Sequence, residues 1–288
     1  MSSTLPVTLA CCGLIGTVAD DRGMLERAFA EACATQGIVP GTAAYAHCMV
    51  GVHQARGQSA VDVFRSLFPG VEGRAEAAAL SFERSFRAAV DRTGMSPVPG
   101  AEQALGQLRD AGIRVCLVTG LSRRLLSQVL DALGWESMAD LTLCPEDAPR
   151  GFPWPDLAFT AMLRLGVEDV QAAAFAASTA SGIECGRRAG TGLVAGVLTG
   201  DHTRDRLRAA GATHLIEGIA QLPALLLGSG AREGRGPAPD APAVSAPGSP
   251  TVSAPGSPAA RIAASGESAP PARVPSPQVP LERRNSGL

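Results

Sequence analysis

Short apolar runs alternate along the chain with stretches in which apolar residues recur at helical spacing. The runs at 7–12, 113–118 and 172–177 are too brief for helices and end in glycine or small polar residues, which is typical of buried strands. Helical spacing covers 101–111, 123–133 and 156–165. The pattern predicts an α/β fold built on a parallel sheet.

Each predicted strand leads directly into a loop of small residues. Gly13 follows the first strand, Thr119 and Gly120 follow the second, and Ser178 and Thr179 follow the third. Open α/β sheets place their ligand sites at the carboxyl ends of the strands, where loop amides point outward. We therefore expect these three loops to meet at one site.

The segment 22–92 differs from its surroundings because it contains no convincing strand. Its helical stretches are 23–36, 41–52, 60–68 and 72–92. It therefore reads as a helical insertion, which gives a core made of 1–21 and 93–227 with a helical domain between them.

The composition changes at about Gly228 to proline, alanine, serine and glycine, and the hexapeptide SAPGSP begins at Ser245 and again at Ser253. So little apolar bulk cannot offset the ordering entropy of a chain. We expect 228–288 to be a disordered tail, either a solvated appendage or a segment that docks on an unidentified protein.

The charge pattern excludes several kinds of chemistry. The net charge is −2, so nothing indicates a nucleic acid or an anionic membrane as partner. All 25 basic residues are arginine. A Schiff-base lysine and a phosphate-clamping lysine are therefore both excluded.

The seven cysteines lie mostly in apolar runs and form no C-x-x-C pair. A disulfide framework or a zinc site is therefore not expected, and buried reduced thiols fit a cytoplasmic protein. The N-terminus has no basic stretch before its apolar run, and no run approaches about 20 apolar residues. We expect no signal peptide and no membrane span.

Four groups of small residues agree in order and spacing with one known family. They are Gly16-Thr17, Thr119-Gly120, the P-x-G-x-P-x-P-D stretch at 149–156, and Gly186 with Ala189-Gly190. Together they resemble the haloacid dehalogenase (HAD) superfamily, most closely its phosphonatase-like branch, over about 5–226. The resemblance implies a Rossmann-like core and a cap domain, here 22–92, that closes over the site and selects the substrate.

The resemblance also assigns catalytic positions, and every one of them is uncharged here. The nucleophilic aspartate falls on Gly13, the residue two further on is Ile15, and the cap lysine falls on Ala60. The phosphate-steadying arginine or lysine falls on Phe152, and the Mg²⁺-binding aspartates fall on Ser178 and Gly182. The Mg²⁺ expected for the family would lack its ligands, so no metal or cofactor is predicted.

Other charged residues could stand in for the missing ones. Glu146 and Asp147, after a short strand at 141–144, are the best remaining acids, and Arg150 could replace the basic residue missing at 152. The other nearby acids are Asp20, Asp21, Asp156 and Glu184. We expect Asp20 to fix the hinge to the cap and Glu184 to point away from the loop.

The backbone of the site keeps features that suit an anion. Gly16, Thr17, Thr119, Gly120 and Arg123 cluster around loop turns and the start of a helix, where amides and the helix dipole favour negative charge. Ser122 or Thr119 can cap that helix. We predict a catalytically degenerate protein that binds a small anion or metabolite and acts as a binding or regulatory module.

An active hydrolase with a non-standard nucleophile is the alternative. Ser178, Cys12 and Thr119 are the candidates, and any of them would need a base within hydrogen-bond reach. His47 and His53 are the histidines of the cap that could supply it.

Overall fold

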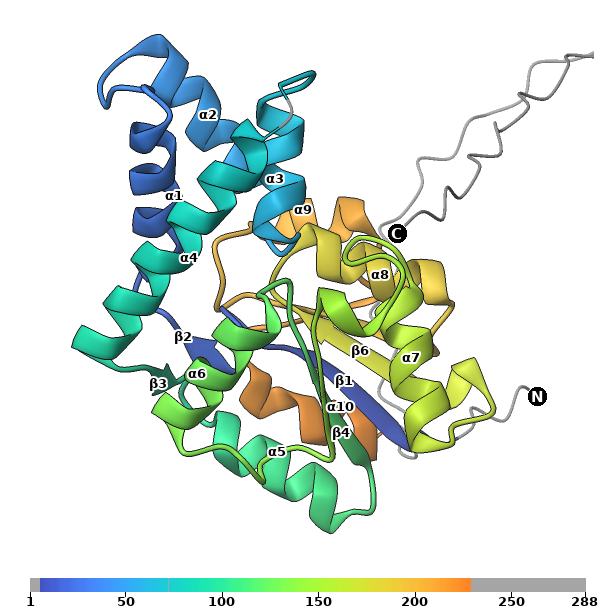
Figure 1. The fold of residues 1–288 in the computed structure, drawn as a ribbon. Coiled ribbons are helices and arrows are strands. Elements are labelled where there is room, and N and C mark those ends of the chain that lie inside the picture. Colours follow the sequence, from blue (N-terminus) through green and yellow to red (C-terminus); the bar gives the residue numbers. More distant parts are fainter. Residues whose placement is uncertain (1–5, 72, 229–288) are drawn as a thin grey trace, which may run out of the picture. The chain divides into compact units, whose positions relative to one another are not determined.

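Strand β1, Leu9–Gly13, lies in the middle of a six-stranded parallel sheet (Figure 1). A computed structural model of the protein describes residues 6–71 and 73–228. The sheet order is β5 (Leu141–Leu143), β4 (Arg114–Val118), β1, β6 (Ala173–Ala177), β7 (Leu193–Val197) and β8 (His214–Ile216). Because β4 and β6 flank β1 in parallel, the carboxyl ends of all three lie at one edge.

Helices cover both faces of the sheet because both faces are apolar. Ala10 and Cys12 face one hydrophobic cluster, whereas Leu9 and Cys11 face the other. The first cluster contains buried residues of three helices, α5 (Ala101–Asp110), α6 (Arg123–Leu133) and α10 (Leu222–Leu227). The second includes α7 (Asp156–Leu165), α8 (Ala180–Ala189) and α9 (Arg204–Ala210). Short 3₁₀ turns are η1 (Pro145–Asp147), η2 (Val170–Ala172) and η3 (Ile219–Gln221).

The chain leaves the sheet after β1 to build four helices, which we call the cap segment together with their loops. They are α1 (Met24–Thr35), α2 (Ala43–Gln54), α3 (Ala60–Leu67) and α4 (Arg74–Thr93). Phe29 of α1 joins them, with its ring 4.3 Å from Phe82 of α4 and 5.5 Å from Phe64 of α3. These rings give the cap segment an apolar centre, which is continuous with the cluster on one face of the sheet.

A small antiparallel ribbon joins the cap segment to the sheet. β2 (Ala19–Asp20) pairs with β3 (Ser96–Pro97), and Val98 N donates to Val18 O at 2.8 Å. Two-residue strands carry too little pattern to be seen in a sequence, and this ribbon was not predicted.

The α/β fold with a parallel sheet is confirmed, and the main elements lie within a few residues of their predicted positions. The tail predicted for 228–288 lies outside the described residues, apart from Gly228. Among the described residues, no helix is both long enough and apolar enough to cross a lipid bilayer.

Candidate ligand site between the sheet and the cap segment

The loops after β1, β4 and β6 meet at the carboxyl edge of the sheet, as the sequence predicted. They enclose a cavity of about 60 Å³, to which α1 and the loop 55–58 of the cap segment also contribute. We call it the central cavity. Such a volume holds on the order of five water-sized groups, so a small metabolite or a phosphate ion would fit by size.

Two hydroxyl groups occupy the floor of the central cavity and bond to each other. Thr17 Oγ1 donates to Ser178 Oγ at 3.0 Å and accepts from Ser178 N at 3.0 Å. Ser178 Oγ in turn donates to Ile15 O at 3.3 Å. Both side chains are buried, and the proton of each hydroxyl already has an acceptor.

Glycines bring no functional group to this floor. A Cβ built on Gly13 would lie 2.9 Å from Thr17 Oγ1, and one built on Gly182 would lie 2.7 Å from Ala177 Cβ. The Thr17 hydroxyl therefore takes up space that a side chain at position 13 would need.

The residues predicted to bind an anion do not all come together. Thr17, Thr119 and Gly120 line the central cavity. Gly16 lines a separate hollow, where Thr199 Oγ1 donates to Gly16 O at 2.7 Å. Arg123 lies away from both.

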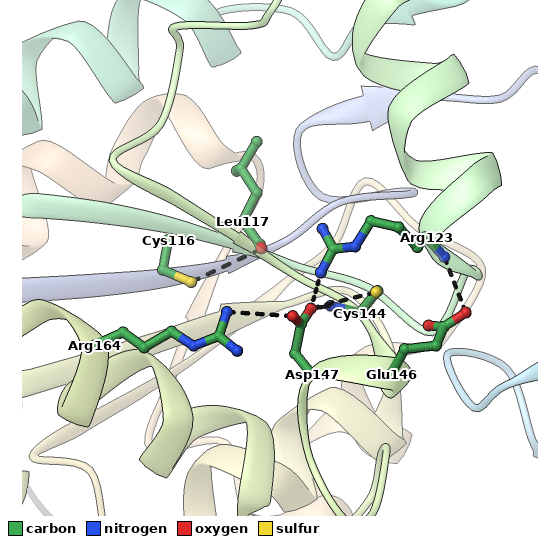
Figure 2. A network of polar contacts seen from close by, with 7 residues as sticks. All are labelled: Cys116, Leu117, Arg123, Cys144, Glu146, Asp147 and Arg164. Carbon is green, nitrogen blue, oxygen red and sulfur yellow. Dashed lines mark hydrogen bonds and ion pairs between the residues drawn. The ribbon is translucent and has the colours of Figure 1, made fainter.

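Arg123 and two acids form a network at the start of α6 (Figure 2). The Arg123 side chain pairs with Asp147, and Arg123 N donates to Glu146 Oε1 at 3.1 Å. Glu146 thus takes the capping role expected of Ser122 or Thr119: Ser122 occupies the N-cap position but makes no cap bond. This helix end already has protein partners where an anion was predicted.

Asp147 is a structural charge in this network. Its carboxylate accepts from Cys144 N at 2.9 Å and from Arg164 Nη1 at 3.2 Å. Burial raises the pKa of Asp147, but the Cys144 hydrogen bonds and the two arginines outweigh it and lower the pKa. Neither Asp147 nor Glu146 lines the central cavity.

The other charged candidates are paired elsewhere. Arg150 binds both oxygens of Asp156, at 3.1 and 2.9 Å, and stacks on Trp154. It therefore does not replace the base missing at Phe152, which is buried in the cavity wall. Glu184 accepts from Arg188 Nη2 at 2.7 Å and does not line the central cavity.

Asp20 is the last residue of β2 in the ribbon and Asp21 follows it, and both bond to nearby backbone. Asp20 Oδ1 accepts from Arg22 N at 2.8 Å, and Asp21 Oδ2 accepts from Leu25 N at 2.7 Å. Asp21 thereby supplies the start of α1 with an acceptor that its N-cap glycine cannot offer. Neither acid lines the central cavity.

One charged residue, Arg56, lines the central cavity, and it is neutralised. It forms an ion pair with Asp201, and its side chain is 10% exposed. At the N-terminus of α8, Ala180 N donates to His202 Nδ1 at 2.8 Å and Gly182 N donates to Thr179 Oγ1 at 3.2 Å. These donors are engaged by the protein, so an anion would have to displace their partners.

Two polar side chains of the cavity wall remain available to a ligand. Thr119 Oγ1 accepts from Leu121 N at 3.1 Å, and its own proton has no acceptor among the described residues. Gln58 also lines the cavity, and its side-chain amide has no hydrogen-bond partner in that part of the chain. Both suit an uncharged polar group.

Core side chains bond to backbone carbonyls at the end of α2 and just after it, and these bonds fix the cap segment to the core. His202 Nε2 bonds His53 O at 2.9 Å, Arg206 donates to Gln54 O at 2.9 Å, and Ser181 Oγ donates to Arg56 O at 2.7 Å. We call these bonds, with the Arg56–Asp201 pair, the latch. They satisfy the carbonyls that a helix end leaves without partners.

No pattern in the sequence indicates the latch. His202 and His53 are 149 positions apart, and neither belongs to a motif of the resemblance. Only the fold brings them together.

Comparison with known proteins shows what kind of chain carries this site. Residues 14–190, more than half of the chain, match the model of the haloacid dehalogenase-like hydrolases. The chain belongs to the haloacid dehalogenase-like hydrolase family. Within it, the chain falls in the phosphonatase-like branch, as the resemblance predicted.

Curated relatives from that branch match about half of the chain. The phosphonoacetaldehyde hydrolase of Bordetella pertussis is 33% identical over 153 residues, covering 45% of this chain and 55% of the relative. That of Pseudomonas paraeruginosa is 31% identical over 167 residues, covering 49% and 60%. The chain thus spans somewhat over half the length of these relatives.

Solved structures extend the likeness of the fold. A phosphonoacetaldehyde hydrolase-like protein from Oleispira antarctica has a TM-score of 0.67 at 21% identity, and the match covers 78% of this chain and 93% of the Oleispira chain. A hydrolase from Pseudomonas syringae also has a TM-score of 0.67 at 21% identity, and its match covers 76% of this chain and 97% of the Pseudomonas chain. At this identity the match concerns the fold alone.

The family's Mg²⁺ does not fit the residues of this site. Its expected ligand positions carry Gly13, Ser178 and Gly182, and Mg²⁺ prefers carboxylate and other oxygen ligands in octahedral geometry. Among the described residues, no three His, Cys, Asp or Glu side chains gather in a way that could hold a metal ion.

The alternative nucleophiles of this family member are poorly placed to react. Burial raises the pKa of the Cys12 thiol far above its ordinary value, so the thiolate is scarce. Both ring nitrogens of His202 are engaged, and His47 and His53 are exposed residues of α2 that do not line the cavity. Ser178 and Thr119 therefore have no histidine base in the cavity wall.

His202 makes the stability of this family member depend on pH. Because the Ala180 amide can only donate, His202 Nδ1 accepts and the proton resides on Nε2. Burial lowers the pKa of His202, and the nearby Arg206, His53 and Arg56 lower it further, against the bond to His53 O. Protonation would break the Ala180 bond.

We expect the free energy of unfolding to fall as the pH is lowered below about 6.5, the value for an unfolded histidine. In that range the unfolded chain binds more protons than the folded one, so stability rises with pH. The stabilising contribution of His202 is fully present above about pH 6.5. Its loss ends once the pH has fallen below the pKa of His202 in the folded chain. Urea unfolding at pH 5–8 measures it, and His202→Gln should flatten the curve. An equally steep curve in that variant would assign the effect to another group.

Proposed function

We propose that this family member has lost hydrolase activity and binds a small uncharged ligand in the central cavity. The observation that carries the proposal is the floor of the cavity. Where the family resemblance places carboxylates, there are a glycine and a closed pair of hydroxyls, Thr17 and Ser178.

The reaction of this family proceeds through attack by an aspartate and a covalent intermediate. A glycine at position 13 has no group that can attack, and the metal would lack carboxylate ligands at 178 and 182. Loss of a nucleophile alone lowers turnover by on the order of 10⁶-fold in another hydrolase. Two separate parts of the mechanism are missing together.

The groups that could bind an anion already have partners within the protein, and this favours an uncharged ligand. Arg56 is paired with Asp201, and Ala180 N and Gly182 N at the start of α8 have protein acceptors. An anion would enter an apolar wall without a free cation, which is costly. Thr119 and Gln58 instead offer hydrogen bonds to a neutral carbonyl or hydroxyl.

Turnover of phosphate monoesters and of phosphonoacetaldehyde by the purified full chain is expected to stay at background, with Mg²⁺ and with chelator alike. Ser178→Ala and Cys12→Ala are matched controls and should behave as the unchanged chain does. Metal-dependent turnover, or turnover that disappears in either variant, would contradict the loss of activity.

Binding can be tested in the same preparation with inorganic phosphate as the probe. Arg56 and the amides of Ala180 and Gly182 already have protein partners. We therefore expect about 10 mM phosphate to leave the melting temperature unchanged, whereas a ligand in large excess over its Kd would raise it. A clear rise that Mg²⁺ does not affect would instead support the anion predicted from the sequence.

A further inference from the structure

Two buried thiols meet inside the cap segment. Cys33 lies in the last turns of α1 and Cys48 lies in α2, with their Sγ atoms 2.6 Å apart. Non-bonded carbon atoms prefer about 3.5–4.0 Å, whereas a disulfide measures about 2.05 Å. The two sulfur atoms need to approach by only about 0.5 Å more to reach bonding distance.

Among the other cysteines, Cys11 and Cys116 also interact with each other, on neighbouring strands of the sheet rather than on two helices. Cys116 Sγ donates to Leu117 O, and Cys144 Sγ donates to the Asp147 carboxylate. Cys33 and Cys48 contact each other from two neighbouring helices joined by the short loop 36–42. No C-x-x-C motif marks them, since they are 15 positions apart.

We propose that Cys33 and Cys48 form a reversible disulfide that joins α1 to α2. The oxidant is a low-molecular-weight disulfide. One cysteine thiolate attacks a sulfur of the oxidant, which forms a mixed disulfide and releases one thiol. The second cysteine then attacks the protein sulfur of that mixed bond and releases the second thiol. Two electrons pass to the oxidant, and the two cysteine protons end on the two released thiols.

Burial governs how fast this exchange proceeds. Burial raises the pKa of Cys33, and its contact with Cys48 raises it further, so Cys33 stays a thiol while the helices are packed. Cys48 is buried as well, with 3% of its surface exposed. The exchange therefore requires a local opening between α1 and α2, and the same burial protects the finished bond from reductants.

The bond would join two walls of the central cavity. α1 contributes Leu25 and Phe29 to that cavity, and α2 leads into the loop 55–58, which contributes Arg56 and Gln58. Linking α1 to α2 therefore restrains both walls relative to each other. This effect does not depend on the proposed ligand.

Peptide mapping of the full folded chain tests the proposal. The chain is incubated with oxidised glutathione, quenched in acid, denatured, alkylated and digested with trypsin. Because the chain has no lysine, cleavage after Arg27 and Arg56 gives one peptide, 28–56, that contains Cys33 and Cys48 and no other cysteine. We expect this peptide to be two hydrogens lighter and unalkylated. Cleavage after Tyr45 should leave its halves joined until they are reduced.

The oxidised chain should also melt at a higher temperature than the reduced chain, by roughly 5–10 °C. This is the scale expected for closing a loop of about 15 residues in a domain of this size. Cys48→Ala should leave Cys33 open to alkylation and remove the difference in melting temperature. Cys185→Ala, a buried cysteine of α8, is the matched control and should change neither result.

Three results would overturn the proposal. The first is alkylation of both cysteines in 28–56 after full exposure to the oxidant. The second is a disulfide between Cys11 and Cys116, neighbours on β1 and β4, in place of the predicted bond. The third is formation of the predicted bond without a rise in melting temperature, which would refute its effect on the cap segment.

Discussion

Gly120→Ala is expected to loosen the cap segment and to speed tryptic cleavage after Arg56 by about tenfold to a hundredfold. A Cβ at position 120 would collide with Gly57 O and would lie 2.8 Å from Gln58 O. Both atoms belong to backbone, so no side chain can turn aside. Overpacking of this kind costs about 1–3 kcal/mol, which the loop 55–58 can relieve only by leaving the core.

The matched control for this experiment is Gly106→Ala. Gly106 lies in α5, and a Cβ there meets no atom within 4 Å. Alanine favours a helix interior over glycine by up to about 1 kcal/mol, so this variant should be at least as stable as the unchanged chain and no more sensitive to trypsin at Arg56. Unchanged cleavage in Gly120→Ala would mean that the loop does not rest on the sheet edge in solution.

Gly186→Ala is expected to lower the free energy of unfolding by about 3 kcal/mol, at the upper end for an overpacked core. Gly186 lies in α8 against β6, and a Cβ there would be 2.6 Å from Phe175 Cβ and 2.9 Å from Phe175 Cγ. Phe175 is fully buried and meets Phe152 edge to face, so its ring has no room to move. Urea unfolding monitored by circular dichroism measures the loss.

A double variant separates this collision from other effects of the substitution. If the ring causes the loss, Phe175→Ala should cost less in the Gly186→Ala background than in the unchanged chain, because residues in contact are not additive. Additive losses would place the strain at the Cβ of residue 175, which alanine retains, rather than at the ring. Gly106→Ala serves again as the helix-interior control.

The strands of the sheet could be predicted because each combines an apolar run with an adjoining glycine or small polar residue. β4 and β6 begin one residue later than predicted, and β1 extends to Gly13. The ribbon of β2 and β3 could not be predicted, because its pairing depends on bringing Ala19 beside Pro97. The sequence holds no local signal for a contact across a whole helical segment.

The meeting of the loops that form the candidate site could be predicted. The hydrogen-bond and ion-pair partners of its side chains could be predicted less well. The meeting of Thr17, Thr119 and Ser178 followed from strand ends and loop residues. The displacement of Arg123 did not, because the sequence cannot show that Asp147 and Glu146 would reach the start of α6. The same limit hid the Cys33–Cys48 contact, which depends on how α1 and α2 rotate against each other.

The latch has one more consequence, for affinity. Its bonds run between protein groups, from His202, Arg206 and Ser181 to carbonyls of the cap segment. An occupant of the cavity therefore has no domain movement to drive, and little of its interaction energy is spent on reorganising the receptor. Such a preorganised receptor should scatter X-rays with the same radius of gyration whether it is empty or filled.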